Sequence, residues 1–114
     1  MKNKQYRPLV LISSALAGDI AGNTKRARKY CRFAVDQGQI PVAPHLLFPQ
    51  FMDDGCPAER ELAIFMGLVL LGKCKELWVF GDISDGMYQE IELAKRRRQP
   101  IRYFDSNCEE VVAE

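Results

Sequence analysis

The sequence predicts an α/β fold, a three-layer sandwich in which helices cover both faces of a parallel sheet. The first observation is that short apolar segments of strand length alternate along the chain with longer segments of helical periodicity. The second is that such helical crossovers join parallel strands with a right-handed sense. The third is that 114 residues, of which 47% are hydrophobic, suit one compact domain over residues 1–114.

The first expected strand covers residues 8–14. Its branched apolar residues are typical of a strand buried on both faces, and it ends in the hydroxyl side chains of Ser13 and Ser14. A loop of small residues over 15–22 follows. We expect the first helix to run from Asn23, which can cap it, to Gly38, because glycine commonly ends helices.

A second, short strand is expected over residues 40–44, at the sheet edge because proline has no N–H for the ladder. The loop over 45–55 is unusually apolar, which favours a segment that folds over the core or lines a cleft. The second helix begins at Pro57 and ends near residues 72–73. From Leu62 onward it is apolar nearly all round, so either a homo-oligomer interface or the rest of the domain should cover its faces.

The third strand is expected over residues 76–81, the third helix over 87–98 and the fourth strand over 101–104. Asp105 or Ser106 can cap a brief helix in the acidic tail. We therefore expect a sheet of four parallel strands, or five, in the order 2-1-3-4. This is a flavodoxin-like arrangement.

Lysine and arginine together number 16, and aspartate and glutamate 15, which leaves a net charge of +1. Such a chain has no strong field to attract polyanions or membrane surfaces, so we expect no nucleic-acid and no membrane partner. The longest apolar run falls well short of the roughly 20 residues that cross a bilayer, and the polar start lacks a secretory signal. These features favour a cytoplasmic protein.

The four cysteines are scattered without the spacing of a zinc site or a disulfide framework, so we expect no metal. Cys31 and Cys74 are interpreted as buried reduced thiols. His45, the single histidine, is a candidate for the substrate site as a general base, or else a packed and hydrogen-bonded residue. The basic run over 95–98 ends a helix, where cations complement the helix dipole.

Ligands of open parallel sheets bind beyond the carboxyl ends of the strands, where the strand order reverses. With the order 2-1-3-4, the loops after the first and third strands flank that point. Ser84 and Gly86 precede a helix whose free N–H groups suit a phosphate or ribose oxygen, and simple capping by Ser84 or Asp85 is the alternative. The candidate site residues in this region are Ser13, Ser14, Gly18, Asp19, Asp82, Ser84, Gly86 and Glu90.

Four segments carry a resemblance to known proteins: residues 11–19, 41–49, 77–81 and 84–90. Over nearly the whole chain they resemble a small bacterial and phage domain family. That family is in turn similar to the nucleoside 2-deoxyribosyltransferases and the deoxynucleoside 5′-monophosphate N-glycosidases. The resemblance implies a domain that binds a nucleoside or nucleotide and needs neither metal nor organic cofactor.

In those enzymes a polar residue after the third strand is followed by a glycine and by the glutamate that attacks the anomeric carbon. Ser84, Gly86 and Glu90 match that spacing. The resemblance implies that Glu90 is the nucleophile, forming a glycosyl ester that water or another base resolves, and that Ser84 binds sugar or 5′-phosphate. The residues implied to hold the sugar are Ser13, Ser14 and Gly18.

The chain departs from the enzymes' pattern at two positions. Their tyrosine on or just after the first strand is replaced by Val10 or Leu16. Their aspartate on the helix before the third strand has no counterpart in residues 64–68, although Glu61 or Asp82 can substitute for it.

The carboxyl-terminal part of the chain contains a further match. Ser106 or Asn107 corresponds to a polar residue that a neighbouring subunit supplies in the enzymes, so the resemblance implies a homo-oligomer. The predicted activity is cleavage or transfer at an N-glycosidic bond. The alternative is a non-catalytic nucleotide-sensing or oligomeric interaction module.

Overall fold

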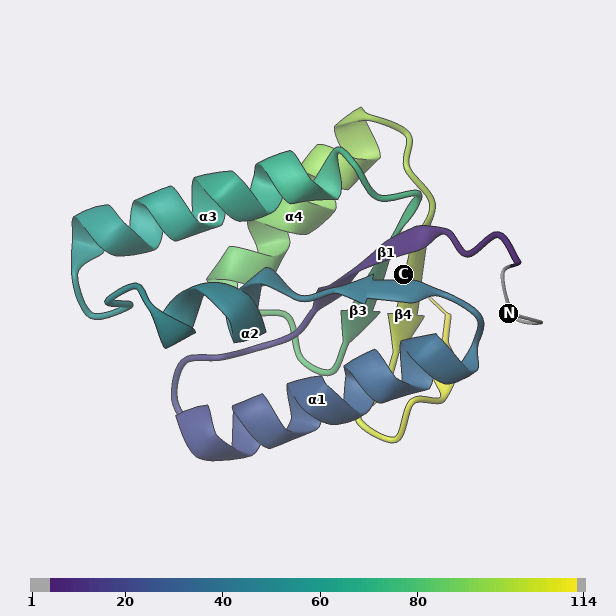
Figure 1. Ribbon diagram of the computed structural model, residues 1–114, viewed down its shortest axis with the longest axis horizontal. Helices are drawn as coiled ribbons and strands as arrows, with labels where there is room; N and C mark the ends of the chain where they lie inside the picture. The colour runs from purple at the N-terminus through teal and green to yellow at the C-terminus, as the bar shows by residue number, and fades with distance from the viewer. Residues whose placement is uncertain (1–4, 113–114) are drawn as a thin grey trace.

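The computed structural model describes residues 5–112, which fold as strands and helices around one sheet (Figure 1). The predicted order of strands and helices is confirmed as far as the fourth strand. Two short helical turns that were not predicted follow the second strand. The elements are β1 (Leu9–Ser13), α1 (Ile20–Asp36), β2 (Ile40–Val42), α2 (Pro44–Leu47), the 3₁₀ turn η1 (Phe48–Gln50), α3 (Pro57–Leu71), β3 (Glu76–Phe80), α4 (Asp85–Arg96), β4 (Ile101–Phe104) and β5 (Glu110–Val111).

The sheet has the strand order β2-β1-β3-β4-β5. The first four of these strands are parallel, as predicted, and the register pairs Leu11 with Leu77 and Ser13 with Val79. The fifth strand is antiparallel to β4. The carboxyl ends of β1 and β3 therefore lie side by side, at the point where the strand order reverses.

The prediction of a helix in the acidic tail is wrong, because residues 110–111 pair with β4 as a strand. The Asp105 carboxylate accepts hydrogen bonds from the backbone N–H groups of Asn107 (2.8 Å) and Glu109 (3.0 Å), which turns the chain back toward the sheet. The Arg102 guanidinium then donates to both oxygens of Glu110, at 2.9 and 2.7 Å. Contacts between two strands thus prevail over local helix signals.

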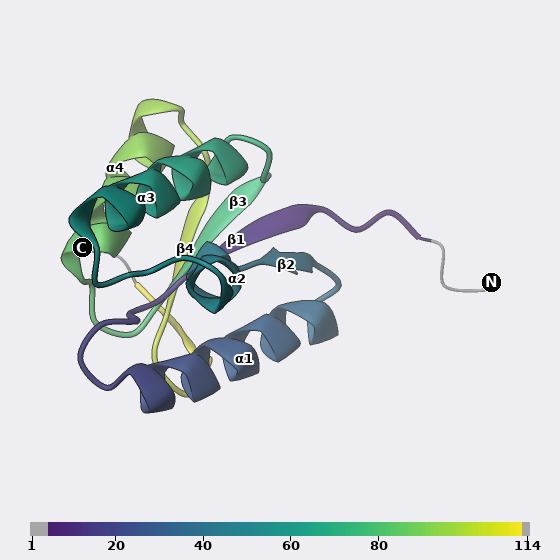
Figure 2. The same ribbon diagram turned by 60° about the vertical axis from the view of Figure 1, so that its left-hand side comes forward.

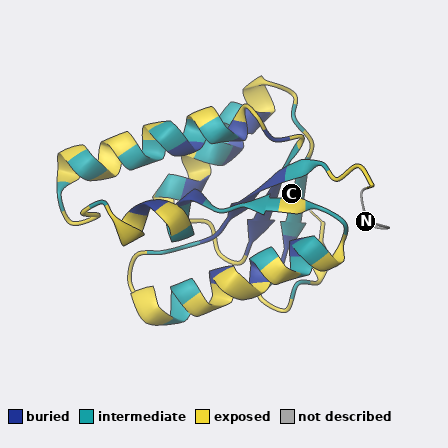
Figure 3. Cartoon of the chain, viewed as in Figure 1, coloured by how far each residue is buried: buried dark blue, intermediate teal, exposed yellow. Residues whose placement is uncertain are grey.

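The domain has three layers: the sheet lies in the middle, α1 covers one face of it, and α3 with α4 covers the other (Figures 1 and 2). Because side chains alternate along a strand, successive residues of β1 face opposite layers. Val10 and Ile12 pack in the cluster that includes Tyr30 of α1, whereas Leu11 packs in the cluster that includes Met87 of α4. The sheet is the most deeply buried layer, as Figure 3 shows.

Two helices begin earlier than predicted. Helix α1 begins at Ile20, because the Asp19 carboxylate caps it by accepting from the Gly22 N–H at 3.1 Å. The Asn23 side chain, expected as the cap, instead donates to backbone carbonyls of the preceding loop. Helix α4 begins at Asp85 with Ser84 as its N-cap, which is the capping role that the sequence allowed.

The apolar segment over 45–55 is partly helical rather than a plain loop, and the second strand ends at Val42 because Pro44 begins α2. Phe48 is buried, whereas Phe51 three residues later is 66% exposed. The segment packs against α3, where a Cβ on Gly67 would lie 3.5 Å from Pro44. It thus folds over the helical layer and also lines a cavity.

Helix α3 is covered on one side only in the isolated chain. Its buried residues are Gly67 and Leu71, while Leu62, Phe65 and Val69 are 47%, 61% and 48% exposed. The expectation that the rest of the domain covers every face of this helix is therefore wrong. No helix within residues 5–112 has the length and apolar character needed to span a membrane.

Candidate functional site

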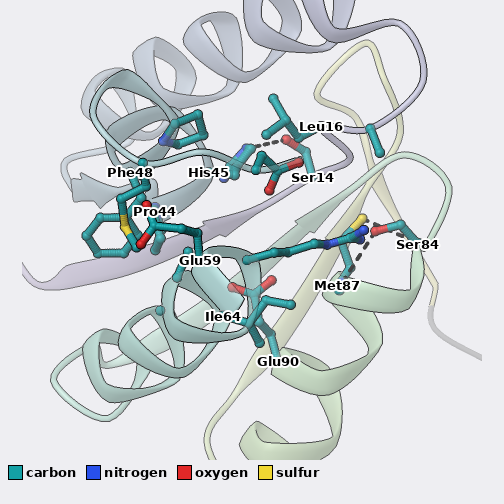
Figure 4. A pocket seen from close by; sticks show the side chains of 18 residues that line it. Ser14, Leu16, Pro44, His45, Phe48, Glu59, Ile64, Ser84, Met87 and Glu90 are labelled. Carbon is teal, nitrogen blue, oxygen red and sulfur yellow. Dashed lines mark hydrogen bonds between the residues drawn. The ribbon is translucent and has the colours of Figure 1, made fainter. Parts of the chain in front are cut away.

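A cavity of about 150 Å³ opens near the carboxyl ends of β1 and β3 (Figure 4). Its walls come from the loop after β1, the α2–η1 segment and the loop that follows it, α3 as far as Gly67, and the start of α4. The lining residues are Ser14, Leu16, Ala17, Pro44, His45, Phe48, Pro49, Met52, Asp54, Glu59, Arg60, Ala63, Ile64, Gly67, Ser84, Gly86, Met87 and Glu90. Five of the predicted site residues are among them: Ser14, His45, Ser84, Gly86 and Glu90.

Glu90 and Ser13 form a partly buried polar contact beside this cavity. Ser13 lies on the same face of β1 as Leu11, toward α4, and Glu90 follows Met87 by one turn on the buried side of α4. The Ser13 hydroxyl, which is 1% exposed, donates to Oε1 of Glu90 at 2.7 Å. Desolvation raises the pKa of Glu90 to about 7, while the Ser13 hydrogen bond acts in the opposite direction.

Ser14 and His45 form a second polar pair, whose hydroxyl and Nε2 atoms lie 2.7 Å apart. Burial lowers the pKa of His45 to about 4, so its ring is neutral near pH 7. A neutral imidazole has one N–H donor and one acceptor nitrogen, and it can bind a polar ligand without adding charge to the cavity. The structure thus places His45 both in a hydrogen bond and in the cavity lining.

The N-terminus of α4 closes another side of the cavity. The Ser84 hydroxyl accepts from the Met87 N–H at 3.4 Å, which is a long capping bond. A Cβ added to Gly86 would meet nothing within 4 Å, so a ligand can approach the backbone there. Figure 4 places Ser84 and Met87 on one side of the cavity, with Phe48 and Pro44 on the opposite side.

Five predicted site residues are not in the lining of this cavity: Ser13, which bonds to Glu90 beside it, and four residues that lie elsewhere. Gly18 is in the left-handed backbone region of its turn, with φ 93°, and Asp19 caps α1. Asn107 is exposed in the turn after β4, where its N–H bonds to Asp105. Asp82 lines a second hollow of about 470 Å³, together with Arg26, Tyr30, Phe80 and Asp105. The two hollows share Ser14.

Helix α3 supplies lining residues that the sequence reasoning missed. Glu59, Arg60, Ala63, Ile64 and Gly67 all line the cavity, whereas Glu61, considered as a substitute carboxylate, does not. Their spacing of three and four residues marks one face of a helix. That signal is weak in this sequence, because α3 is apolar nearly all round and no polar face orients it.

Comparison with known proteins identifies the family. A family model described as a domain of unknown function, DUF7768, matches residues 8–104. The chain belongs to the DUF7768 family. A search of curated proteins finds no match to this DUF7768 domain.

Among solved structures, the DUF7768 domain is similar to a 2-deoxyribosyltransferase from the psychrotolerant bacterium Bacillus psychrosaccharolyticus. The TM-score is 0.69 at 16% sequence identity, and the match covers 91% of this chain and 76% of the other. At that identity the likeness establishes a common fold. The predicted resemblance to deoxyribosyltransferases is thus confirmed for the fold, and the flavodoxin-like strand order agrees with it.

Proposed function

We propose that this domain binds a nucleoside or nucleoside 5′-monophosphate and cleaves or transfers its N-glycosidic bond, with Glu90 as the nucleophile. The observation that carries the proposal is the Glu90 carboxyl group, held by the Ser13 hydroxyl at 2.7 Å beside a cavity at the strand-order reversal. The fold shared with a 2-deoxyribosyltransferase supports the same ligand class.

The cavity lining suits a ligand with an aromatic base and a polar sugar. Phe48, Met52 and Ile64 offer apolar surface to a base, in the manner of small-molecule sites that combine apolar walls with a few polar groups. Ser84 and Gly86 offer a hydroxyl and accessible backbone to sugar or phosphate oxygens. Glu90 lies in the same lining, where it can reach the sugar carbon between these two parts.

In the proposed reaction a Glu90 oxygen forms a bond to the anomeric carbon as the bond from that carbon to the base nitrogen breaks. The electron pair of the broken bond leaves with the base, which takes up a proton. Water or a second base then attacks the same carbon, and the Glu90 carboxylate is released. The attacking form is the ionised carboxylate, so the raised pKa of Glu90 limits the active fraction near pH 7.

The test is to incubate the purified protein with a panel of deoxynucleosides and their 5′-monophosphates and to follow free base by chromatography. We expect base release by the wild type and a loss of about 1000-fold or more in Glu90→Ala, because the covalent step disappears. Glu92→Gln is the matched control, since Glu92 is on the same helix but outside the cavity lining. Undiminished release by Glu90→Ala would reject the proposed mechanism.

The same panel separates the enzyme from a nucleotide-sensing module. If a nucleotide raises the melting temperature of the protein but no base is released, the cavity binds ligand without catalysis. That outcome would support the sensing alternative and overturn the catalytic part of the proposal.

A further inference from the structure

The exposed side of α3 carries a ridge of large apolar side chains. Leu62, Phe65 and Val69 are 47%, 61% and 48% exposed, and their spacing of three and four residues places them along one line of the helix. The opposite side of α3 faces the cavity and Pro44. Figure 3 shows exposed surface along α3 at the edge of the molecule. An apolar ridge of this kind indicates a contact with another protein surface.

The charges at the two ends of α3 indicate which surface that is. Glu61 is exposed in the first turns of α3 and outside the cavity lining, and Lys73 and Lys75 follow its last turn. Within residues 5–112 none of these three takes part in an ion pair. An antiparallel copy of the same helix would bring its basic end to the acidic end of the first, and would also oppose the two helix dipoles.

The spacing of the ridge is equally self-complementary. Leu62 and Val69 lie at equal distances on either side of the midpoint between residues 65 and 66. In an antiparallel pair centred there, Leu62 of one copy faces Val69 of the other, and the two Phe65 side chains meet near the two-fold axis. Such a contact is isologous and closes after two copies.

We propose that two copies of this chain pair through α3, packed antiparallel with Leu62, Phe65 and Val69 at the centre of the contact. This inference stands on the exposed ridge and its charges and does not depend on the proposed enzymatic function. It does have a consequence for the cavity, because Glu59, Arg60 and Ile64 of the same helix form part of the cavity wall. The second copy would brace that wall from outside.

Sedimentation of the full chain tests the pairing. We expect the wild type to have twice the 13.0 kDa mass of the chain and Phe65→Glu to have half the wild-type mass, with an unchanged circular dichroism spectrum. Phe51→Glu is the matched control, because Phe51 is 66% exposed but lies outside α3, and its mass should stay that of the wild type. A monomeric wild type, or a dimeric Phe65→Glu, would overturn the proposal.

Cysteine cross-linking tests the antiparallel orientation, with the oxidised wild type as the baseline for the native thiols. Phe65→Cys should form a covalent dimer under oxidation, because its two copies meet at the axis. Lys73→Cys should not, because antiparallel packing separates its two copies by about 22 Å along the helices. Cross-linking of both variants would indicate a parallel pair and contradict the proposed geometry. Neither experiment measures turnover, so their failure would leave the role of Glu90 untouched.

Discussion

The Ser13 hydroxyl lies 2.7 Å from Oε1 of Glu90, although the two residues are 77 positions apart in the chain. The contact joins the last residue of β1 to the buried side of α4, across the cavity edge. A largely buried carboxyl group loses much of its hydration, and one hydroxyl donor replaces only part of it. The pKa of Glu90 therefore depends on both the burial of its carboxyl group and the Ser13 hydrogen bond.

The activity proposed for the cavity should rise with pH. Because the pKa of Glu90 is raised to about 7 and the ionised form attacks, we expect base release to increase about tenfold from pH 6 to pH 8 and then to level off. The measurement is the rate of base release with the best substrate of the panel across this range. A rate that is flat between pH 6 and pH 8 would contradict this role for the Glu90 ionisation.

Ser13→Ala should move the midpoint of that pH–rate profile to higher pH. The variant removes the donor that stabilises the Glu90 carboxylate, so the pKa of Glu90 should rise further and the rate at pH 7 should fall by roughly tenfold. Ser13→Thr retains a hydroxyl and should recover part of the rate and the original midpoint. A purely structural role for Ser13 would lower the rate at all pH values by the same factor, without a shift of the midpoint.

Glu90→Gln should stabilise the protein at alkaline pH. The pKa of Glu90 in the folded chain, about 7, lies above its ordinary value of 4.5, so the folded state holds the proton more tightly and the wild type loses stability as pH rises between these values. A shift of that size corresponds to at most about 3 kcal/mol. Urea unfolding at pH 8 should show the gain, which should vanish near pH 4.5. A gain of equal size at pH 8 and pH 4.5 would contradict this role of the Glu90 ionisation.

Much of the fold could be predicted from local patterns. The β3 strand and the fourth strand over 101–104 are short segments rich in apolar and aromatic residues, with clear turn residues on either side. The predicted start of the first helix at Asn23 is wrong, because Asp19 is the cap, and asparagine and aspartate have similar intrinsic capping strength. The sequence does not show this, because it depends on the folded loop, in which the Asn23 amide donates hydrogen bonds to the carbonyls of Leu16 and Ala17.

The candidate site could likewise be predicted only in part. Glu90 and Ser84 could be placed beside the end of β1, because the strand order alone brings those loops together. The place of Glu59 and Arg60 in the cavity lining could not be predicted, because it depends on how α3 is rotated about its axis. A helix that is apolar nearly all round gives no signal for that rotation. The position of Asp19 outside the cavity likewise follows from its capping bond.

His45 should make the protein sensitive to acid. Burial lowers the pKa of His45 to about 4 from an ordinary value of 6.5, so the unfolded chain binds this proton more readily than the folded chain. Stability from the neutral ring is complete above pH 6.5 and is lost as pH falls toward 4, by at most about 3 kcal/mol. His45→Gln can still bond to Ser14 but cannot be protonated, so it should lose less stability than the wild type between pH 7 and pH 5. Urea unfolding at the two pH values measures this difference directly.

The Glu90 ionisation changes stability in the opposite direction over the same pH range. The comparison should therefore be repeated in the Glu90→Gln background. If the proteins with and without His45 lose equal stability there, the result would contradict a buried, neutral imidazole.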